Sequence, residues 1–301
     1  MTSARPSVVV ILAAGEGKRM KSATPKVLHP VAGRSLLGHV IEAASAIEPQ
    51  HLMVVVGHGR DEVTAHVEEI APWALTVVQE RQGGTGHAVR VALEDLAARG
   101  IPTSDGPIVV LTGDTPLLTG GTLVGLLLEH GDTGASATVL TARLGDPTGY
   151  GRIVRDPDGS VSAIVEDKDA TEEQRGIDEI NSGMYAFAAD RLAESLAGLT
   201  TDNAQGEEYL TDVLGLLRRD GDTVSASLCA DPSEILGVND RLQLAEAAAI
   251  MRDRINAAWM RGGVAILDPA STWLDVDVDL EPDVTIRPNV TLRGPTSVAT
   301  G

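Results

Sequence analysis

The residues best suited to chemistry lie in one basic, glycine-containing stretch near the start of the chain. It reads Leu12-Ala13-Ala14-Gly15-Glu16-Gly17-Lys18-Arg19-Met20 and continues to Lys26. Between Glu16 and Glu42 there is no Asp or Glu but there are five Lys or Arg, although the formal net charge of the chain is −19. Small residues let a ligand approach the backbone, whose N–H groups can then donate hydrogen bonds. Arg19 and Lys26 add positive charge, so the stretch predicts binding of a phosphorylated ligand.

Two familiar phosphate-binding motifs do not describe this loop. A Walker A loop needs G-x-x-x-x-G-K-[ST], which the stretch lacks. A dinucleotide fingerprint needs G-x-G-x-x-G, but Met20 stands at the third glycine. A solvated surface loop is the alternative interpretation of the charge run. We rank it lower because loops at strand ends are where open α/β sheets bind ligands.

The elements that must position this loop alternate between strands and helices. Short apolar runs bounded by glycine predict buried strands, and longer periodic stretches predict helices. The predicted strands are 8–12, 52–56, 75–78 and 108–111, and the predicted helices are 36–47, 61–70 and 87–98. This alternation predicts an α/β fold with a mixed, mostly parallel, Rossmann-like sheet.

The pattern changes after Gly134. Strands are predicted at 135–140, 151–155, 161–165 and 180–188 with few helices between them, which indicates an antiparallel extension of the sheet. A long linker helix follows, starting at Arg241 and ending at Gly262-Gly263. Its apolar residues at roughly helical spacing are Leu242, Leu244, Ala248, Met251, Ile255 and Trp259.

The tail has a period of its own. From Leu280 it reads LEPDVT, IRPNVT, LRGPTS and VATG, which is the hexapeptide period of a β-helix. A β-rich tail that repeats by chance is the alternative. It is less favoured because the first and the fifth residue of each six-residue unit both keep the period. The repeats amount to little more than one three-sided coil. We therefore expect a main domain at 1–240, a linker helix at 241–262 and a β-helix start at 263–301.

Composition argues against several classes of protein. The single cysteine, Cys229, cannot form an internal disulfide, which favours a reducing compartment and predicts a cytoplasmic protein. The apolar run at 8–14 is much shorter than the roughly 20 residues of a membrane-spanning helix. Nucleic-acid binding is not expected, because it needs a basic surface and this chain is acidic.

The basic stretch resembles a known family. Leu12-Ala13-Ala14-Gly15-x-Gly17-x-Arg19-Met20 with Pro25-Lys26 is similar to the signature of sugar-nucleotide pyrophosphorylases. Pro25-Lys26-Val27-Leu28-His29 resembles the bacterial bifunctional N-acetylglucosamine-1-phosphate uridyltransferases and glucosamine-1-phosphate acetyltransferases, whose second domain is a left-handed β-helix. Further motifs fall in this family's order: Gln79 with Gly84 to Ala88, Leu111 to Leu118, Pro147 to Ile153, Ile164 to Glu166, Glu179 to Gly183, Asn203 to Glu207, and Gly237 to Arg241.

The resemblance implies a reaction and a cofactor. UTP and N-acetylglucosamine 1-phosphate would give UDP-N-acetylglucosamine, a cell-wall precursor, and pyrophosphate by in-line attack on the α-phosphate. Arg19 and Lys26 would act on the triphosphate, and Asp114 and Asn239 would bind Mg²⁺, an ion that prefers oxygen ligands and takes few protein groups. From the residues alone, a helix cap or a turn is the alternative interpretation of Asp114, and it is the preferred interpretation of Asn239.

The resemblance also implies the remaining contacts to the substrates. The base would meet Gln79, Gly84 and Thr85 together with the backbone of Leu12, Ala13, Ala14 and Gly15. The sugar would meet Gly151, Glu166 and Asn181, and Asn239 would be a further substrate contact. Taken alone, Gln79 could equally be a polar strand end, and Glu166 could be a solvated carboxylate.

Departures from the family pattern leave alternatives open. Lys18 stands where Thr is usual, and Asp240 stands where a second Asn is usual. The acetyltransferase site would lie beyond residue 301, so only the uridyltransferase activity is expected of this chain. The resemblance implies a homotrimer for the full-length protein and leaves the assembly of this chain open. A related transferase for another base or sugar, and a non-catalytic regulatory subunit, are the alternative functions.

Overall fold

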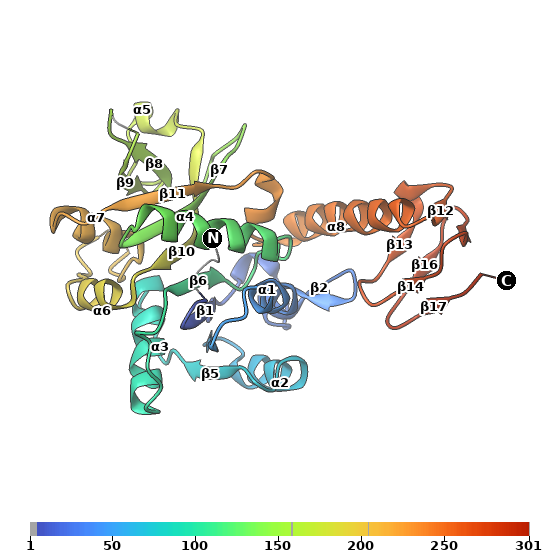
Figure 1. Cartoon of the computed structure of the whole chain (residues 1–301), viewed down its shortest axis with the longest axis horizontal. Coiled ribbons are helices and arrows are strands. Elements are labelled where there is room, and N and C mark those ends of the chain that lie inside the picture. Colours follow the sequence, from blue (N-terminus) through green and yellow to red (C-terminus); the bar gives the residue numbers. More distant parts are fainter. Residues whose placement is uncertain (1–4, 158, 204, 301) are drawn as a thin grey trace.

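The computed structural model describes residues 5–157, 159–203 and 205–300. The ends of the predicted segments 1–240 and 263–301, and Ala204 in the motif from Asn203 to Glu207, lie outside the described residues. A body of sheet and helices carries an arm made of one long helix and a stack of short strands (Figure 1). In the main sheet the strand order is β11-β7-β10-β6-β1-β4-β5, and β8 and β9 pair beside β10.

The parallel half of the sheet is the half that the alternating pattern predicts. Its elements are β1 (Val8–Ala13), α1 (Leu36–Ser45), β4 (His51–Val56), α2 (Arg60–Ile70), β5 (Leu75–Val78), α3 (Thr85–Ala98), β6 (Ile108–Thr112) and α4 (Gly120–Thr133). Val9 and Ile11 of β1 pack with α1, α2 and α4, while Val8 and Val10 pack with α3 on the opposite face. Because both faces are covered, the central strands are apolar throughout rather than alternating. The prediction of a Rossmann-like α/β fold is confirmed.

The second half of the sheet is mainly antiparallel, as predicted. Its elements are β7 (Ala137–Arg143), β8 (Arg152–Arg155), β9 (Val161–Val165), α5 (Glu172–Arg175), β10 (Glu179–Phe187), α6 (Ala189–Ala197), α7 (Thr211–Arg219) and β11 (Val224–Leu228). The strand β10 runs antiparallel to β6, β7 and β8, whereas β11, which was not predicted, runs parallel to β7.

In the described chain, the short α5 is the only helix between the four predicted strands, as expected, but two helices after β10 were not predicted. The helices α6 and α7 lie there, and each is nine residues long with one narrow buried stripe. Leu192 and Leu196 form the stripe of α6, and Val213, Leu214 and Leu217 form that of α7. Two turns give too few repeats for a helical period to stand out in the sequence. Both helices cover the same face of the sheet as α3.

The arm consists of α8 (Arg241–Arg261) and six two-residue strands. These strands are β12 (Ala265–Ile266), β13 (Trp273–Leu274), β14 (Asp279–Leu280), β15 (Thr285–Ile286), β16 (Thr291–Leu292) and β17 (Ser297–Val298). In α8 the predicted apolar stripe is incomplete, because Leu242 is 69% exposed. Within the described residues, no helix is both long enough and apolar enough to cross a lipid bilayer.

The strands of the arm pair in two layers, so the estimate of about one coil is wrong. β12, β13 and β14 pair in parallel with β15, β16 and β17. The first layer is hidden in the sequence because eight residues, including the turn η4 (Pro269–Ser271), separate the starts of β12 and β13. Inward residues from both layers, such as Ile266, Leu274, Leu280 and Ile286, form one apolar core. The two layers are therefore stabilised by an interior of their own.

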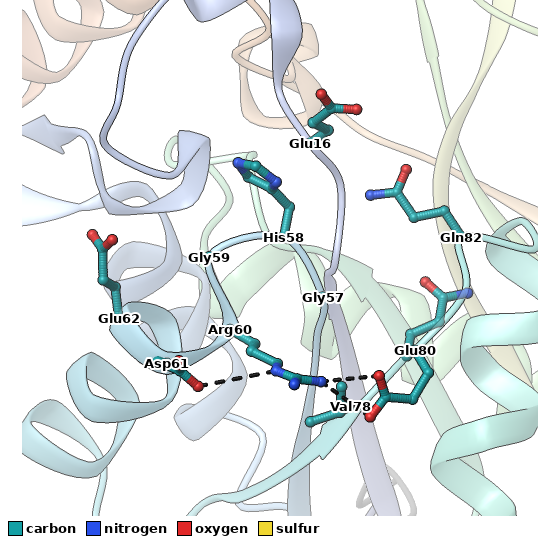
Figure 2. Close-up of a pocket in the computed structure, with 11 residues that line it drawn as sticks. Glu16, Gly57, His58, Gly59, Arg60, Asp61, Glu62, Val78, Glu80 and Gln82 are labelled. Carbon is teal, nitrogen blue, oxygen red and sulfur yellow. Dashed lines mark hydrogen bonds and ion pairs between the residues drawn. The ribbon is translucent and has the colours of Figure 1, made fainter.

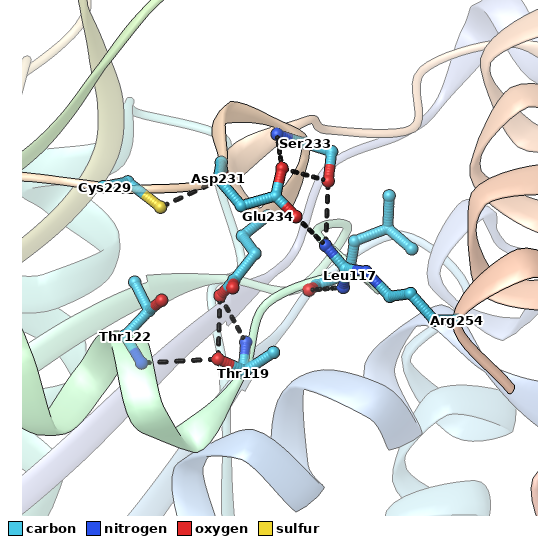
Figure 3. Close-up of polar contacts among 8 residues, drawn as sticks. All are labelled: Leu117, Thr119, Thr122, Cys229, Asp231, Ser233, Glu234 and Arg254. Carbon is cyan, nitrogen blue, oxygen red and sulfur yellow. Dashed lines mark hydrogen bonds and ion pairs between the residues drawn. The ribbon is translucent and has the colours of Figure 1, made fainter. Parts of the chain in front are cut away.

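Arg254 fastens α8 to the body (Figure 3). Its Nη1 donates to the Leu117 carbonyl oxygen at 2.6 Å, and its Nη2 donates to Asp231 Oδ2 and Ser233 Oγ, both at 2.8 Å. Leu117 follows β6, and Asp231 and Ser233 follow β11. One guanidinium therefore joins the arm to two loops of the body.

Arg254→Ala is expected to lower the free energy of unfolding by about 1–3 kcal/mol, because the Leu117 carbonyl loses its side-chain donor. The lower part of that range is favoured, because the Arg254 side chain is 28% exposed and water can replace some of its contacts. Urea denaturation measures the change. Arg261→Ala, at the exposed end of the same helix, is the matched control. Equal losses in the two variants would contradict a fastening role.

Candidate functional site

The loops at the carboxyl ends of the parallel strands enclose a cavity of about 270 Å³, here called the β1 cavity. Its lining comprises Leu12, Ala13, Ala14, Gly15, Lys26, Val27, Gln79, Gln82, Gly84, Thr85, Ala88, Thr112, Asp114 and Glu207. Nine of these are residues that the sequence predicted for the site. Parallel strands end at one edge of the sheet, so loops distant in sequence meet there.

A second cavity of about 240 Å³, here called the Glu166 cavity, adjoins the first. Its lining comprises Leu12, Thr85, Thr112, Glu166, Asn181, Gly183, Tyr185, Gln205, Glu207, Tyr209, Leu210 and Thr211. Four residues, Leu12, Thr85, Thr112 and Glu207, line both cavities. Two ligands could therefore lie side by side across this shared wall.

Lys26, Asp114 and Asn239 converge in the structure. Lys26 Nζ lies 2.5 Å from Asp114 Oδ2 and 3.2 Å from Asn239 Oδ1. The Lys26 and Asp114 side chains are only 13% and 18% exposed, so their charges are largely shielded from water. Gly17 makes this approach possible, because a Cβ there would lie 2.6 Å from Lys26 Cβ and its φ is +64°.

The backbone holds Asn239 beside Asp114. Val238 N donates to the Asp114 carbonyl at 2.9 Å, and Gln243 Oε1 accepts from Asn239 N at 2.8 Å. Asp240, one of the departures from the family pattern, is the N-cap of α8 and accepts from the N–H groups of Leu242 and Gln243. The geometry therefore gives Asp240 a structural role at the start of the arm.

The oxygen atoms around Lys26 fit a divalent cation of the magnesium type. Asp114 Oδ2 and Asn239 Oδ1 both lie within 3.2 Å of a single positively charged atom, Lys26 Nζ. A carboxylate and an amide oxygen are hard ligands, and Mg²⁺ commonly takes one or two protein groups with phosphates and water. In the described part of the chain, no cluster of three His, Cys, Asp or Glu side chains could hold a metal. A cation at Asp114 and Asn239 would thus need ligand oxygens as well.

Gln79 closes the other end of the β1 cavity. It follows β5, is 6% exposed, and donates from Nε2 to the Gly84 carbonyl at 3.1 Å, while the same Nε2 lies 2.8 Å from His87 Nδ1. Gly84 has a φ of +104°, and a Cβ there would lie 2.4 Å from the Glu208 carbonyl oxygen. Thr85 Oγ1 accepts from Leu210 N at 3.0 Å, which joins this turn to the wall of the Glu166 cavity.

Gly151, Glu166 and Asn181 lie together. A Cβ on Gly151 would lie 3.5 Å from Glu166 Oε1 and 3.6 Å from Asn181 Cβ. Asn181 Oδ1 accepts from Gly183 N and from Tyr185 Oη, which leaves Nδ2 to donate to a ligand. Burial is the main cause that raises the pKa of Glu166, and nearby carboxylates add to it. A partly buried carboxyl group of this kind suits a ligand with several hydroxyl donors.

Three predicted residues, Arg19, Gly151 and Asn239, line neither cavity. Asn239 contacts Lys26 and Gly151 lies beside Glu166, whereas Arg19 stands apart from both cavities. Arg19 lies exposed on the turn η1 (Lys18–Met20). Its neighbour Lys18 forms an exposed ion pair with Glu16 at 3.0 Å. Much of the positive charge in this loop therefore faces solvent, and Lys26 alone of its cations lines the β1 cavity.

Sequence reasoning assigned no role to several lining residues. Gln82 Nε2 donates to the Ala14 carbonyl at 3.0 Å and so joins the loop after β5 to the loop after β1. Glu207 lines both cavities, and Tyr209 lines the Glu166 cavity. Glu207 lies in a motif that matched the family, which was the available signal, whereas nothing in the local sequence around Gln82 points to the first loop.

A third hollow, of about 450 Å³, lies beside the β1 cavity (Figure 2). His58, Arg60 and Glu80 line it, and it shares Gln79 and Gln82 with the β1 cavity. Arg60 already pairs with Glu80 at 2.9 Å. This third hollow is larger than the β1 cavity, but neither Lys26 nor Asp114 lines it. The β1 cavity and the Glu166 cavity are therefore the candidate site.

Comparison with known proteins places the chain among nucleotide-handling proteins. Residues 9–218 match the family described as "MobA-like NTP transferase domain". The chain is 56% identical over 302 residues to "Bifunctional protein GlmU" of Streptomyces coelicolor, covering 100% of this chain and 62% of that relative. It is also 56% identical to the protein of the same name from Thermobifida fusca, and this match covers 92% of this chain and 57% of that relative. The chain thus spans about three-fifths of the length of these curated relatives.

Proposed function

This chain belongs to the family of MobA-like NTP transferase domains, and we propose that it is a uridylyltransferase. The proposed reaction joins UTP to N-acetylglucosamine 1-phosphate and gives UDP-N-acetylglucosamine and pyrophosphate, a step toward cell-wall precursors. An oxygen of the sugar phosphate attacks the α-phosphorus of UTP. The new O–P bond forms as the bond from the α-phosphorus to the bridging oxygen breaks, and pyrophosphate leaves.

The observation that carries this proposal is the shared wall between the two cavities. The β1 cavity offers a phosphate-binding loop, a lysine and a glutamine at its far end, which suits a nucleotide. The Glu166 cavity offers a carboxylate, an amide and a tyrosine, which suits a sugar. The reaction needs two anionic substrates held in line, and positioning of this kind supplies much of the rate. No protein nucleophile is required.

Charge neutralisation is the task of Lys26 and its neighbours. We propose that the Lys26 ammonium donates to the α-phosphate, where negative charge is redistributed during attack. Asp114 and Asn239 would hold Mg²⁺, whose charge would offset that of the phosphate oxygens. Lys26 Nζ now lies against the same two oxygens, so phosphate binding would move the ammonium toward the ligand. Arg19, on the same loop, remains a proposed contact for the outer phosphates.

The far ends of the cavities would select the substrates. We propose that Gln79, Gly84 and Thr85, with the backbone of Leu12 to Gly15, hold the base. Asn181 would donate from Nδ2 to the acetamido oxygen, while Glu166 would accept from the sugar hydroxyl groups. The closeness of Gly151 to Glu166 supports this arrangement, because a side chain there would fill space beside the carboxylate.

Pyrophosphate release by the purified chain with Mg²⁺ tests the function directly. Each of UTP, dTTP, CTP, GTP and ATP is paired with N-acetylglucosamine, glucosamine and glucose 1-phosphates. We expect release with UTP and N-acetylglucosamine 1-phosphate above all others. Activity with a different pair would keep the reaction type and overturn the substrate assignment. No release with any pair, from folded protein, would favour a regulatory subunit.

Glu166→Gln is expected to raise the KM for the sugar phosphate by about 10-fold or more and to leave the KM for UTP nearly unchanged. A hydrogen bond to a charged group contributes about 1.5–3 kcal/mol, and the amide replaces one acceptor with a donor. Steady-state kinetics with each substrate varied in turn measures the effect. Glu173→Gln, on exposed α5, is the control. An unchanged KM for the sugar phosphate would remove Glu166 from the proposed sugar contacts.

Assembly and location follow as further parts of the proposal. We propose that the full-length protein associates as a homotrimer through its β-helix, of which this chain carries two layers of strands. Analytical ultracentrifugation would measure the oligomeric state of this chain. Because UTP is a cytoplasmic metabolite, we expect the protein to act in the cytoplasm.

A further inference from the structure

The Gln79 side chain has one amide orientation that its surroundings favour. Nε2 lies 3.1 Å from the Gly84 carbonyl oxygen and 2.8 Å from His87 Nδ1, so both of its hydrogens are used within the protein when Nδ1 carries no proton. The amide nitrogen has only two hydrogens to donate. Oε1, an acceptor, is therefore the atom of this amide that remains for a ligand in the β1 cavity.

The opposite orientation would be unfavourable. If the amide rotated by half a turn, Oε1 would face the Gly84 carbonyl, placing two acceptors together. It would also face His87 Nδ1, which could pair with Oε1 only if it carried a proton. Burial, and the charge of Arg90 next, lower the pKa of His87, which favours the neutral ring. In the neutral ring that accepts at Nδ1, the proton lies on Nε2.

The ring of His87 is itself held in place. His87 lies in the first turn of α3, and a Cβ on Gly83 would lie 3.0 Å from its Cγ, so the loop packs closely on the ring. Glu208 N donates to the Gly83 carbonyl and Gly86 N donates to the Glu208 carbonyl, both at 2.8 Å. These paired bonds fix the loop on both sides of Gly84 and keep Nδ1 aimed at Gln79.

We propose that His87 is a specificity-determining positioning residue, which holds Gln79 Oε1 toward the base so that the site accepts a pyrimidine with a hydrogen on N3. Uracil carries that hydrogen and can donate it to Oε1. Cytosine has an unprotonated N3, so the two acceptors would repel one another in a largely buried site. The inference rests on the proposed function, because it requires that the β1 cavity hold the base of a nucleoside triphosphate.

Calorimetric titration with UTP and with CTP, in Mg²⁺ and without sugar phosphate, tests the proposal apart from turnover. The native protein is expected to bind UTP on the order of 10–100-fold more tightly than CTP, because binding CTP would leave one buried acceptor without a hydrogen-bond partner. His87→Leu fills the space but offers no acceptor, so this preference is expected to fall by about 5–10-fold. His87→Asn keeps an acceptor oxygen near the position of Nδ1 and is expected to retain the preference within about 2-fold.

The possible outcomes separate the two claims. An equal preference for UTP in the native protein and in His87→Leu would overturn the role of His87, as would equal binding of UTP and CTP by the native protein. Loss of preference in His87→Asn as well would point to packing rather than an acceptor and would also overturn it. If His87→Leu fails to fold, His87→Ala replaces it, with circular dichroism as the check. If the native protein binds neither nucleotide, the proposed function itself fails.

Discussion

Lys26→Ala is expected to lower kcat/KM for UTP by on the order of 10²–10³-fold, the cost of removing one preorganised donor from a transition state. Lys26 is the cation that lines the β1 cavity, and its Nζ is held by Asp114 and Asn239 rather than by solvent. The fold should persist with a loss of stability, since Lys26 lies on the short turn η2 (Lys26–Leu28) but its removal leaves the Asp114 carboxylate without this partner. Pyrophosphate release under steady-state conditions measures the effect.

Two comparisons sharpen this test. Lys18→Ala removes a cation of the same loop whose side chain is 78% exposed, and it should change kcat/KM by less than about 3-fold. In the absence of nucleotide, Mg²⁺ binding by Lys26→Ala should be no weaker than in the native protein, because the ammonium competes for the same oxygens. Turnover near the native value in Lys26→Ala would exclude a role for Lys26 at the α-phosphate.

Asp114→Asn is expected to lower kcat by about 10³-fold or more, since charge compensation by a divalent cation contributes several kcal/mol to phosphoryl-type transition states. The substitution keeps the shape of the side chain but removes the one carboxylate that, among the described residues, pairs with Lys26 Nζ. The concentration of Mg²⁺ needed for half-maximal rate should rise in parallel. A titration of Mg²⁺ at saturating UTP measures both quantities.

Asp132→Asn, at an exposed position near the end of α4, is the matched control and should change neither quantity. The stability of Asp114→Asn should fall only modestly, because the amide oxygen can still accept from Lys26. A thermal melt therefore separates loss of fold from loss of the cation. An unchanged requirement for Mg²⁺ in Asp114→Asn would show that the cation binds elsewhere.

The sequence predicted the parallel half of the sheet well for a physical reason. Strands covered by helices on both faces must be apolar along their whole length, so β1 and β4 stand out as runs of Val, Ile and Leu. By contrast, α4 was not predicted, because four of its fourteen residues are glycine and its stability depends on packing against the sheet. The first layer of the β-helix was not predicted because β12 and β13 start eight residues apart, which breaks the six-residue period at its beginning.

Local sequence alone determined the strand–loop–helix order of the main domain, the basic loop after β1 and the hexapeptide tail, because these depend on residues that are neighbours along the chain. Only the tertiary structure decided which side chains meet. Lys26 lies 88 residues from Asp114 and 213 from Asn239, and no periodicity links such positions. They meet because parallel strands end at the same edge of the sheet. A backbone hydrogen bond from Val238 N to the Asp114 carbonyl oxygen also holds the start of the arm at that edge.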